Sequence, residues 1–180
     1  MDSHELSVLV EDNIELIPDF PEEGVLFRDI TPLLANGPAF KELVETLAER
    51  YRGKIDYVAG LESRGFILAA PMATELGIGM LTARKKGKLP GPVISVDYEL
   101  EYGTATLELR PETVPPSARV LIVDDVLATG GTARAAIELI EGCGAEVVGV
   151  IVLLELIELG GRARLDGYEV ETVVEVDESI

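Results

Sequence analysis

Apolar runs of strand length alternate with helical segments through the middle of the chain. Residues 119–123 and 145–154 are continuous apolar runs, and residues 130–140 between them predict a helix. The same alternation earlier in the chain predicts a helix over 39–51, a strand over 55–59, a helix over 66–76 and a strand over 78–82. Apolar strands with helices between them are typical of a parallel sheet covered on both faces. We therefore expect an α/β fold with a mainly parallel central sheet flanked by helices.

Other segments depart from this alternation. After a short polar start, residues 17–34 are interrupted by three prolines and a glycine, which predicts an irregular arm. Residues 93–98 and 104–109 alternate with a period of two and predict a pair of antiparallel strands. Residues 168–176 predict a final edge strand.

The length of 180 residues suits one folding unit, and no linker or internal repeat divides the chain. We expect a single domain over residues 1–180. Within it, a small N-terminal hood is expected at about residues 1–36 and a flexible loop at about residues 84–103, where lysines, glycines and prolines gather.

The chain carries 33 acidic and 15 basic residues, for a formal net charge of −18. Nucleic acids and anionic membranes are bound by basic surfaces, so neither is an expected partner. The single cysteine, Cys143, excludes an internal disulfide and suits a reducing compartment. Residues 1–10 lack the features of a signal peptide, and the longest apolar run, residues 147–154, is too short to cross a bilayer. We expect a cytoplasmic protein.

The strongest functional signal is the stretch "VLIVDDVLATGGT", residues 120–132. Its apolar run ends in Asp124 and Asp125, at the carboxyl end of an expected strand, where open α/β sheets bind ligands. The Thr-Gly-Gly-Thr loop suits a phosphate, because glycines let the backbone approach it and the next helix directs free N–H groups toward it. The two carboxylates would repel that phosphate unless they bind another part of the ligand, such as sugar hydroxyls. The pattern therefore predicts a site for a ribose 5-phosphate.

A purely structural interpretation of this stretch stays open, in which the acids cap a turn and the glycines only shape it. Two other phosphate-binding patterns lose support. A Walker A loop needs Gly-Lys followed by Ser or Thr, and no strand-to-helix turn contains Gly-x-Gly-x-x-Gly. Nucleoside triphosphate hydrolysis and dinucleotide binding are therefore not expected.

The same stretch resembles the phosphoribosyl pyrophosphate-binding motif of type I phosphoribosyltransferases. Five others resemble the adenine-specific members of that family, in order and with compatible spacing: "DFPEEGVLFRDITPLL", "GLESRGF", "RKKGKLPG", "LEYG" and "LLELIELGGRARL". The resemblance covers about residues 17–165, and residues 166–180 match no motif of the family. It implies the family's fold and the transfer of ribose 5-phosphate from phosphoribosyl pyrophosphate to N9 of adenine, giving AMP and pyrophosphate.

The resemblance also implies roles for single residues. The residues expected to hold the 5-phosphate are Ala128, Thr129, Gly130, Gly131 and Thr132. The ribose hydroxyls would be held by Asp124 and Asp125. The residues expected to hold pyrophosphate are Arg64, Arg84, Lys85 and Lys88. Taken alone, the basic cluster on the loop would be interpreted as a solvated surface, but beside a phosphate loop it favours a pyrophosphate site.

Glu101 matches the family's catalytic acid/base and Tyr102 its companion tyrosine, both on the flexible loop. Without the resemblance, Glu101 would be a surface acid in a turn. The family often places a cis peptide in the "GLESRG" turn, which here would fall between Glu62 and Ser63.

Adenine would pack between Phe27 and Val126, and backbone groups around Arg28 would bind its Watson–Crick edge. Taken alone, Phe27 is a core residue of the arm. The resemblance implies Mg²⁺ as a cofactor that is held by pyrophosphate and ribose oxygens, with no direct protein ligand. It also implies a homodimer.

Two alternatives remain open. Because base choice depends on a few contacts in the arm, a xanthine or hypoxanthine-guanine phosphoribosyltransferase is the nearer one. The other is a regulator with the same fold that binds nucleic acid, against which the charge of −18 counts.

Overall fold

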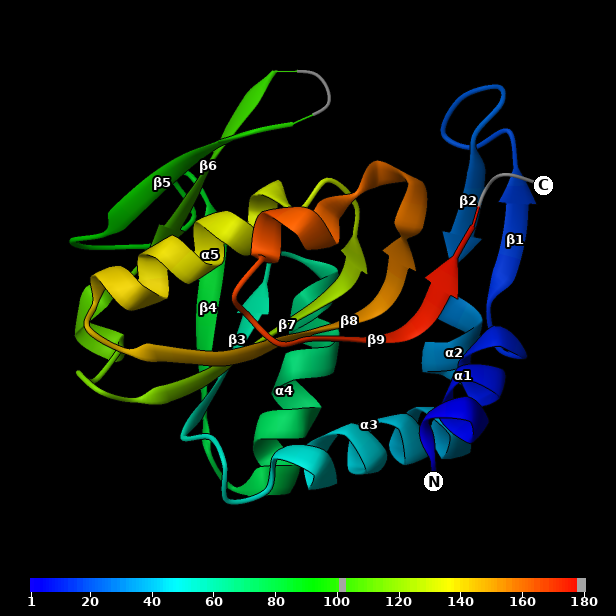
Figure 1. The fold of residues 1–180 in the computed structure, drawn as a ribbon, viewed down its shortest axis with the longest axis horizontal. Coiled ribbons are helices and arrows are strands. Elements are labelled where there is room, and N and C mark those ends of the chain that lie inside the picture. The colour runs from blue at the N-terminus through cyan, green and yellow to red at the C-terminus, as the bar shows by residue number, and fades with distance from the viewer. Residues whose placement is uncertain (101–102, 178–180) are drawn as a thin grey trace.

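The structure is a computed structural model that describes residues 1–100 and 103–177. Its centre is a seven-stranded sheet with the order β5-β6-β4-β3-β7-β8-β9 (Figure 1). The strands are β3 (Tyr57–Leu61), β4 (Gly79–Lys85), β5 (Ile94–Glu99), β6 (Thr104–Leu109), β7 (Arg119–Leu127), β8 (Glu146–Leu156) and β9 (Val170–Val176). Strands β4, β3, β7, β8 and β9 run parallel, whereas β5 and β6 are antiparallel. The expected mainly parallel sheet and antiparallel pair are confirmed.

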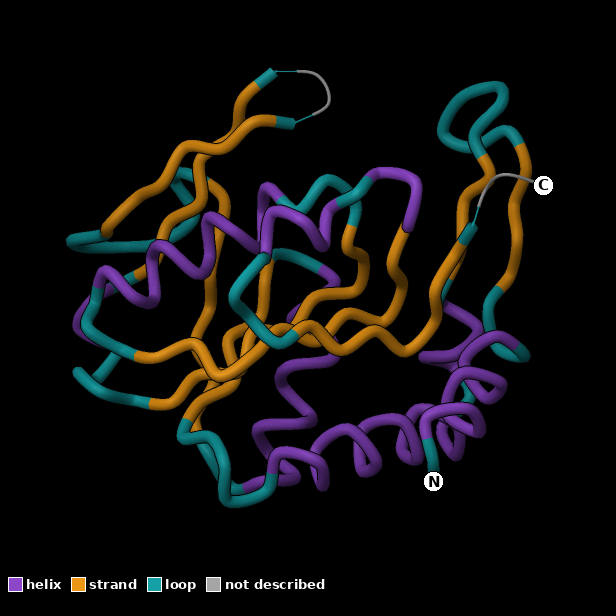
Figure 2. The backbone as a smooth tube through the Cα atoms, in the orientation of Figure 1, coloured by secondary structure: helices purple, strands orange, loops and turns teal. Residues whose placement is uncertain are grey.

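Helices cover both faces of this sheet (Figure 2). The helices are α1 (Ser3–Glu11), α2 (Thr31–Ala35), α3 (Gly37–Tyr51), α4 (Arg64–Leu76) and α5 (Gly131–Gly142), with 3₁₀ turns η1 (Pro111–Thr113), η2 (Ile157–Leu159) and η3 (Gly161–Leu165). One buried cluster joins α1, α3 and α4 to the sheet, and a second joins α5 to it through Ile137 and Ile140. Within residues 1–100 and 103–177, no helix has the length and apolar character needed to span a membrane.

The order of the strands changes direction at β3. From β3 the chain adds β4 on one side, makes the β5–β6 excursion, and then adds β7 on the other side of β3. In open α/β sheets, a reversal of this kind leaves a crevice beyond the carboxyl ends of the two strands. The residues after β3 and those at the end of β7 therefore border the same crevice.

A two-stranded antiparallel sheet is formed by β1 (Glu15–Pro18) and β2 (Leu26–Asp29) and lies beside the end of β9 (Figure 1). The expectation of an irregular arm is wrong for these strands and for α2. Two of the three prolines lie at the ends of elements, where the chain needs no backbone N–H: Pro18 is the last residue of β1, and Pro32 lies in the first turn of α2. Pro21 lies in the connection between β1 and β2.

Helix α1 was not predicted from the sequence. A capping box starts it: the Asp2 carboxylate accepts a hydrogen bond from the Glu5 N–H, and the Glu5 carboxylate accepts one from the Asp2 N–H, each at 2.9 Å. Its buried side chains are Leu6 and Val10, four residues apart on one face of the helix. The polar residues between them make the segment look like an unstructured start.

The C-terminal strand β9 pairs in parallel with β8 at the edge of the sheet, which confirms the predicted edge strand. It also contacts α3, because Glu171 accepts a hydrogen bond from the Tyr51 hydroxyl at 2.9 Å and forms an ion pair with Arg50. The segment that matches no family motif is thus part of the main sheet.

Candidate active site

The two adjacent acids lie on β7 itself. The apolar run predicts a strand that ends at Val123, but β7 continues to Leu127 because its last residues still pair with β8. Asp124 and Asp125 therefore belong to the strand rather than following it, which corrects the expectation. The sheet fixes the backbone that carries both carboxylates.

Asp124 and Asp125 have different partners. The Arg64 Nε lies 2.6 Å from Asp125 Oδ2, and Asp125 is only 7% exposed. The Asp124 carboxylate accepts a hydrogen bond from the Asp125 backbone N–H at 2.9 Å. Burial, and then the neighbouring charge of Asp125, raise the pKa of Asp124 well above its ordinary value. The pair thus consists of one ion-paired carboxylate and one that holds its proton more tightly.

The turn after β3 brings α4 close to these acids. A Cβ on Gly65 would stand 2.7 Å from the carbonyl oxygen of Val123, so a larger residue would displace the first turn of α4, which carries Arg64. The peptide between Glu62 and Ser63 in this turn is cis, as the family resemblance implies.

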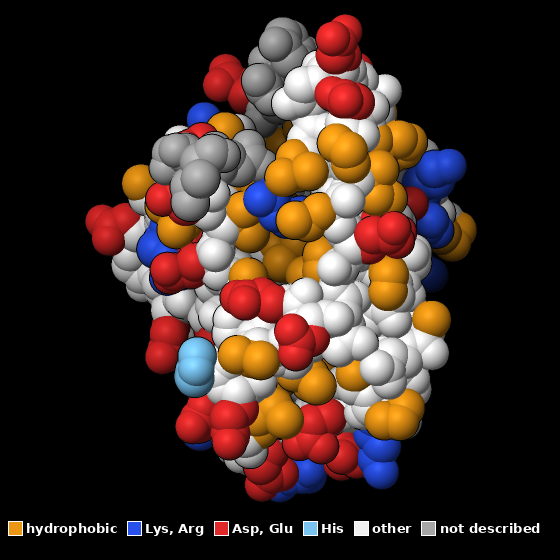
Figure 3. Space-filling model, turned by 90° about the vertical axis from the view of Figure 1, so that its right-hand side faces the viewer, with side chains coloured by type: hydrophobic (Ala, Val, Ile, Leu, Met, Phe, Trp, Pro, Cys, Tyr) orange, Lys and Arg blue, Asp and Glu red, His pale blue; other side chains and the backbone are white. Residues whose placement is uncertain are grey.

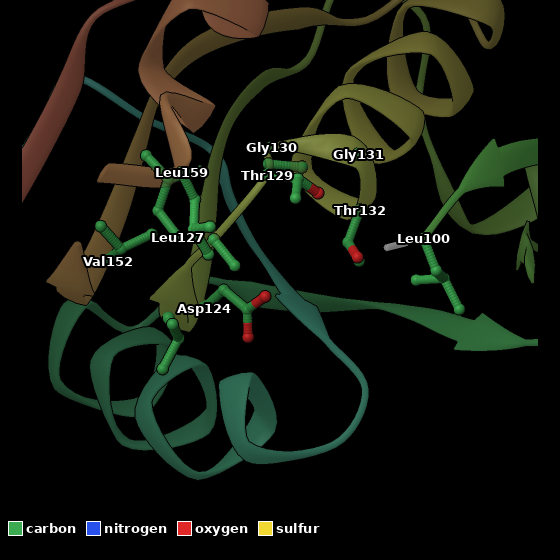
Figure 4. A pocket seen from close by; sticks show the side chains of 12 residues that line it. Leu100, Asp124, Leu127, Thr129, Gly130, Gly131, Thr132, Val152 and Leu159 are labelled. Carbon is green, nitrogen blue, oxygen red and sulfur yellow. The ribbon is translucent and has the colours of Figure 1, made fainter. Parts of the chain in front are cut away.

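The loop after β7 borders a cavity of about 190 Å³ (Figure 4). The structure brings together on it all five residues predicted to hold a phosphate: Ala128, Thr129, Gly130, Gly131 and Thr132. Asp124 and Leu127 of β7 lie on one side of the loop and Leu100 on another (Figure 4). Gly130 has a φ of 82° and ends the loop, so that α5 begins at Gly131 with the free N–H groups of its first turn near the cavity. This arrangement suits an anion.

A larger cavity of about 610 Å³ adjoins the acids on the side of β3. It is lined by Arg64, Lys85, Asp124, Asp125 and Thr132, together with Glu62, Ser63, Tyr98, Leu100 and Ala105. Two of the four cations predicted to hold pyrophosphate therefore share a cavity with both acids. A diphosphate in this cavity would lie between cationic side chains and the end of the phosphate loop.

The basic end of β4 is held by Glu62, the residue directly after β3. Glu62 accepts hydrogen bonds from Arg84 Nη2 at 2.9 Å and from the Lys85 N–H at 2.6 Å. Burial raises the pKa of Glu62, but these two bonds outweigh it and hold that pKa below its ordinary value. Arg84 Nη1 donates to the Lys88 carbonyl at 3.3 Å. Arg84 therefore binds Glu62 and the turn that follows β4. Glu62 lines the larger cavity, whereas Arg84 lies behind it.

An apolar cavity of about 600 Å³ lies on the other side of Arg64. The three residues predicted to bind a base, Phe27, Arg28 and Val126, meet there. Arg64 borders both cavities, with its guanidinium carbon 5.8 Å from the centre of the Phe27 ring. The lining residues that the sequence analysis missed are Val25, Leu26, Leu154, Leu156 and Leu159. No polar pattern marks them, because they are apolar residues on or beside strands.

Glu101 and Tyr102, the predicted catalytic acid/base and its companion, lie outside the described residues. Leu100, directly before them, lines both the phosphate-loop cavity and the larger one. The end of β5 thus brings the chain to the crevice immediately before Glu101.

Comparison with known proteins identifies relatives of this chain. Residues 31–179 match the family model of the phosphoribosyl transferase domain. The adenine phosphoribosyltransferase of Thermobifida fusca (strain YX) is 52% identical over 175 residues, which are 97% of this chain and 99% of that protein. The crystal structure of adenine phosphoribosyltransferase from Thermoanaerobacter pseudethanolicus has a TM-score of 0.90 and 45% identity, covering 94% of this chain and 99% of that one. The enzyme from Saccharomyces cerevisiae, complexed with an imino-altritol bisphosphate and adenine, has a TM-score of 0.89 and 38% identity, covering 95% and 99%.

Proposed function

The chain belongs to the phosphoribosyl transferase family, among its adenine phosphoribosyltransferases, and we propose on this basis that it transfers ribose 5-phosphate from phosphoribosyl pyrophosphate to N9 of adenine. The products are AMP and pyrophosphate, so the reaction salvages a purine base. The observation that carries the proposal is the crevice itself. Its acid pair and phosphate loop lie between a cation-lined cavity and an apolar one.

The phosphate loop would hold the 5-phosphate through its backbone N–H groups and the hydroxyls of Thr129 and Thr132. Asp124 and Asp125 would accept hydrogen bonds from the ribose hydroxyls. Because these carboxylates lie on β7 and the loop directly continues it, the two ends of a ribose 5-phosphate can be bound by one short stretch of chain. Positive charge that develops on the ribose ring during displacement would be stabilised by the nearby carboxylates.

Pyrophosphate, the leaving group, would be held by Arg64 and Lys85 in the larger cavity. Arg84 at the end of β4 and Lys88 on the turn after it would add positive charge nearby. Arg64 would exchange its ion pair with Asp125 for the more strongly charged pyrophosphate, using its planar fork of donors. That exchange would free Asp125 for the ribose.

Adenine would occupy the apolar cavity, with Phe27 and Val126 on its faces and the backbone around Arg28 at its Watson–Crick edge. From that position N9 would face the acid pair, since Asp125 and Val126 line the same cavity. Glu101 would exchange a proton with the base, and Tyr102 would assist from the same loop. Both roles rest on the family resemblance.

Mg²⁺ is the cofactor that the family implies, and the carboxylates of Asp124 and Asp125 beside the cation-lined cavity are compatible with it. Within residues 1–100 and 103–177, no cluster of three or more His, Cys, Asp or Glu side chains is placed to hold a metal. By the family resemblance, the ion would be bound chiefly by substrate oxygens and water, and when bound it would neutralise charge on the diphosphate. From the family we also propose a homodimer and a cytoplasmic location.

Product formation tests the proposal directly. Phosphoribosyl pyrophosphate and Mg²⁺ are incubated with the protein and, in parallel, with adenine, hypoxanthine, guanine or xanthine, and the nucleotides are separated by chromatography. We expect AMP from adenine and no nucleotide from the other three bases. Turnover of a different base would change the specificity, and no turnover of any base would refute the transferase function.

A further inference from the structure

The "GGRAR" stretch, residues 160–164, belongs to a motif for which the reaction as described has no role. It includes the start of the 3₁₀ turn η3, whose backbone lies against the phosphate loop. The two segments are about thirty residues apart in the sequence. Their contact is made by backbone atoms on both sides.

Gly161 is the centre of this contact. A Cβ on Gly161 would stand 2.9 Å from the backbone nitrogen of Gly130 and would overlap the carbonyl oxygen of Ala128. In the other direction, a Cβ on Gly130 would stand 2.5 Å from the carbonyl oxygen of Gly161. No side chain fits between the two backbones. The φ of Gly161 lies outside the left-handed region, unlike that of Gly130, so the close approach alone requires glycine there.

Arg162 anchors η3 to two strands of the central sheet. Its Nε donates to Glu155 of β8 at 3.1 Å, and its Nη2 forms an ion pair with the same carboxylate. The Nη2 also lies 2.9 Å from the Thr172 hydroxyl of β9, and the Nη1 donates to the Val170 carbonyl at 2.9 Å. The guanidinium thus joins the turn to β8 and to the edge strand β9.

Glu155 is only 5% exposed, so its charge needs these partners. It also accepts a hydrogen bond from the Thr172 hydroxyl at 2.7 Å. Burial raises the pKa of Glu155, but the bonds from Arg162 and Thr172 outweigh it and keep that pKa below its ordinary value. The anchor is therefore ionic and directional, and it fixes the residue that follows Gly161.

We propose that Gly161 and Arg162 are positioning residues that brace the phosphate loop through this backbone contact and so set the geometry of its N–H donors for the 5-phosphate. The proposal rests on the proposed function. The brace acts chiefly on the 5-phosphate end of the substrate, since the cations of the pyrophosphate cavity come from β4 and α4 and the phosphate loop contributes only Thr132 to that cavity. Donors that stand too far from a phosphate oxygen lose most of their binding strength, so a small displacement of the loop matters.

The test is a comparison of two ligands on one variant. For Gly161→Ala we expect the affinity for ribose 5-phosphate to fall by about tenfold to a hundredfold, as for a misplaced binding group, while the affinity for pyrophosphate stays unchanged. Calorimetric titration measures both, and the KM for phosphoribosyl pyrophosphate should rise while the KM for adenine does not. The matched control is Gly142→Ala, because Gly142 is exposed at the far end of α5 and a Cβ there meets nothing within 4 Å.

A second variant covers the case in which Gly161→Ala fails to fold. Arg162→Lys keeps a positive charge beside Glu155 but loses the planar fork, and we expect a smaller loss with the same preference for ribose 5-phosphate. Equal weakening of both ligands, or no weakening of ribose 5-phosphate in Gly161→Ala, would overturn the brace. If only Arg162→Lys leaves the affinity for ribose 5-phosphate unchanged, Arg162 is not part of the brace. If the wild-type chain binds neither ligand and makes no AMP, the proposed function itself fails.

Discussion

At the scale of single residues, Asp124 combines a functional position with an unfavourable environment for its charge. It lies at the end of β7, between the phosphate loop and Asp125. Because burial and the Asp125 charge raise its pKa, there is a pH range above the ordinary pKa in which the folded protein keeps a proton on Asp124 that the unfolded chain has released. The free energy of unfolding therefore falls as the pH rises from about 4, the ordinary pKa of an aspartate, through the pKa of Asp124 in the folded protein.

Asp124→Asn should therefore make the protein more stable at pH 8 than the wild type. Asparagine has the same shape and does not titrate, so the advantage grows with pH, by up to about 1.4 kcal/mol per pH unit inside the window. Urea unfolding of both proteins at pH 5 and pH 8 measures it, and Asp166→Asn, at an exposed position, is the control. The variant should also make AMP more slowly. Equal stability of variant and wild type at both pH values would contradict the raised pKa.

Glu101→Gln addresses the role that rests on family resemblance. If Glu101 exchanges a proton with the base, glutamine keeps the size of the side chain and removes that ability, so kcat should fall by about a hundredfold or more while the affinity for both substrates changes little. Steady-state rates and titration of adenine give the two quantities. An unchanged kcat would exclude Glu101 as the acid/base.

At the scale of elements, sequence and structure agree where one contiguous segment carries the signal. The phosphate loop and the acids that precede it form a single run, so the sequence predicts that they lie together, and in the structure they line two adjoining cavities. The strand that carries them was predicted too short, because charged residues at a ligand site interrupt an apolar pattern without ending the pairing with β8. Helix α1 was missed because its two buried residues are too few to give a clear helical period.

The apolar cavity shows the opposite case. Its lining comes from β2, α4, β7, β8 and η2, five elements that approach one another only in the folded chain. Leu154 and Leu156 look like any other core residues of a strand, so no local pattern distinguishes a base-binding position from a packing position. The family resemblance implies Phe27 and Val126 as contacts of the base, but it does not point to these leucines.

Phe27 tests whether this cavity holds the base. Phe27→Ala should raise the KM for adenine by about fivefold to 150-fold, because stacking of a base on an aromatic side chain contributes about 1–3 kcal/mol. The KM for phosphoribosyl pyrophosphate should stay near the wild-type value. Phe20→Ala is the matched control, because Phe20 is 50% exposed and contacts the Phe27 ring at 5.1 Å between centroids. A smaller effect at Phe27 than at Phe20 would place the base elsewhere.

At the scale of the whole molecule, the charge distribution opposes the proposed chemistry. The chain has a net charge of −18, and acidic side chains are spread over the face that carries α1 and the β1–β2 sheet (Figure 3). Its substrate is nevertheless a polyanion. The cations that would bind it are gathered at the crevice, on the first turn of α4 and at the end of β4, and Glu62 holds the end of β4 in place. The site is thus a local exception to the protein's overall field.

This contrast gives two salt effects of opposite sign. Self-repulsion of a chain with this charge weakens as ions screen it, so NaCl should stabilise the fold, and a gain of about 1 kcal/mol would raise Tm by about 2–4 °C for a chain of this length. The ion pairs between the crevice and phosphoribosyl pyrophosphate are screened by the same ions, so its KM should rise over the same range. Thermal melts and initial rates across one NaCl series measure both trends, and KCl at equal ionic strength should reproduce them, because screening does not depend on which ion is present. A Tm that falls with salt would mean that attractive ion pairs, such as Arg119 with Asp56, outweigh the repulsion among the excess acids.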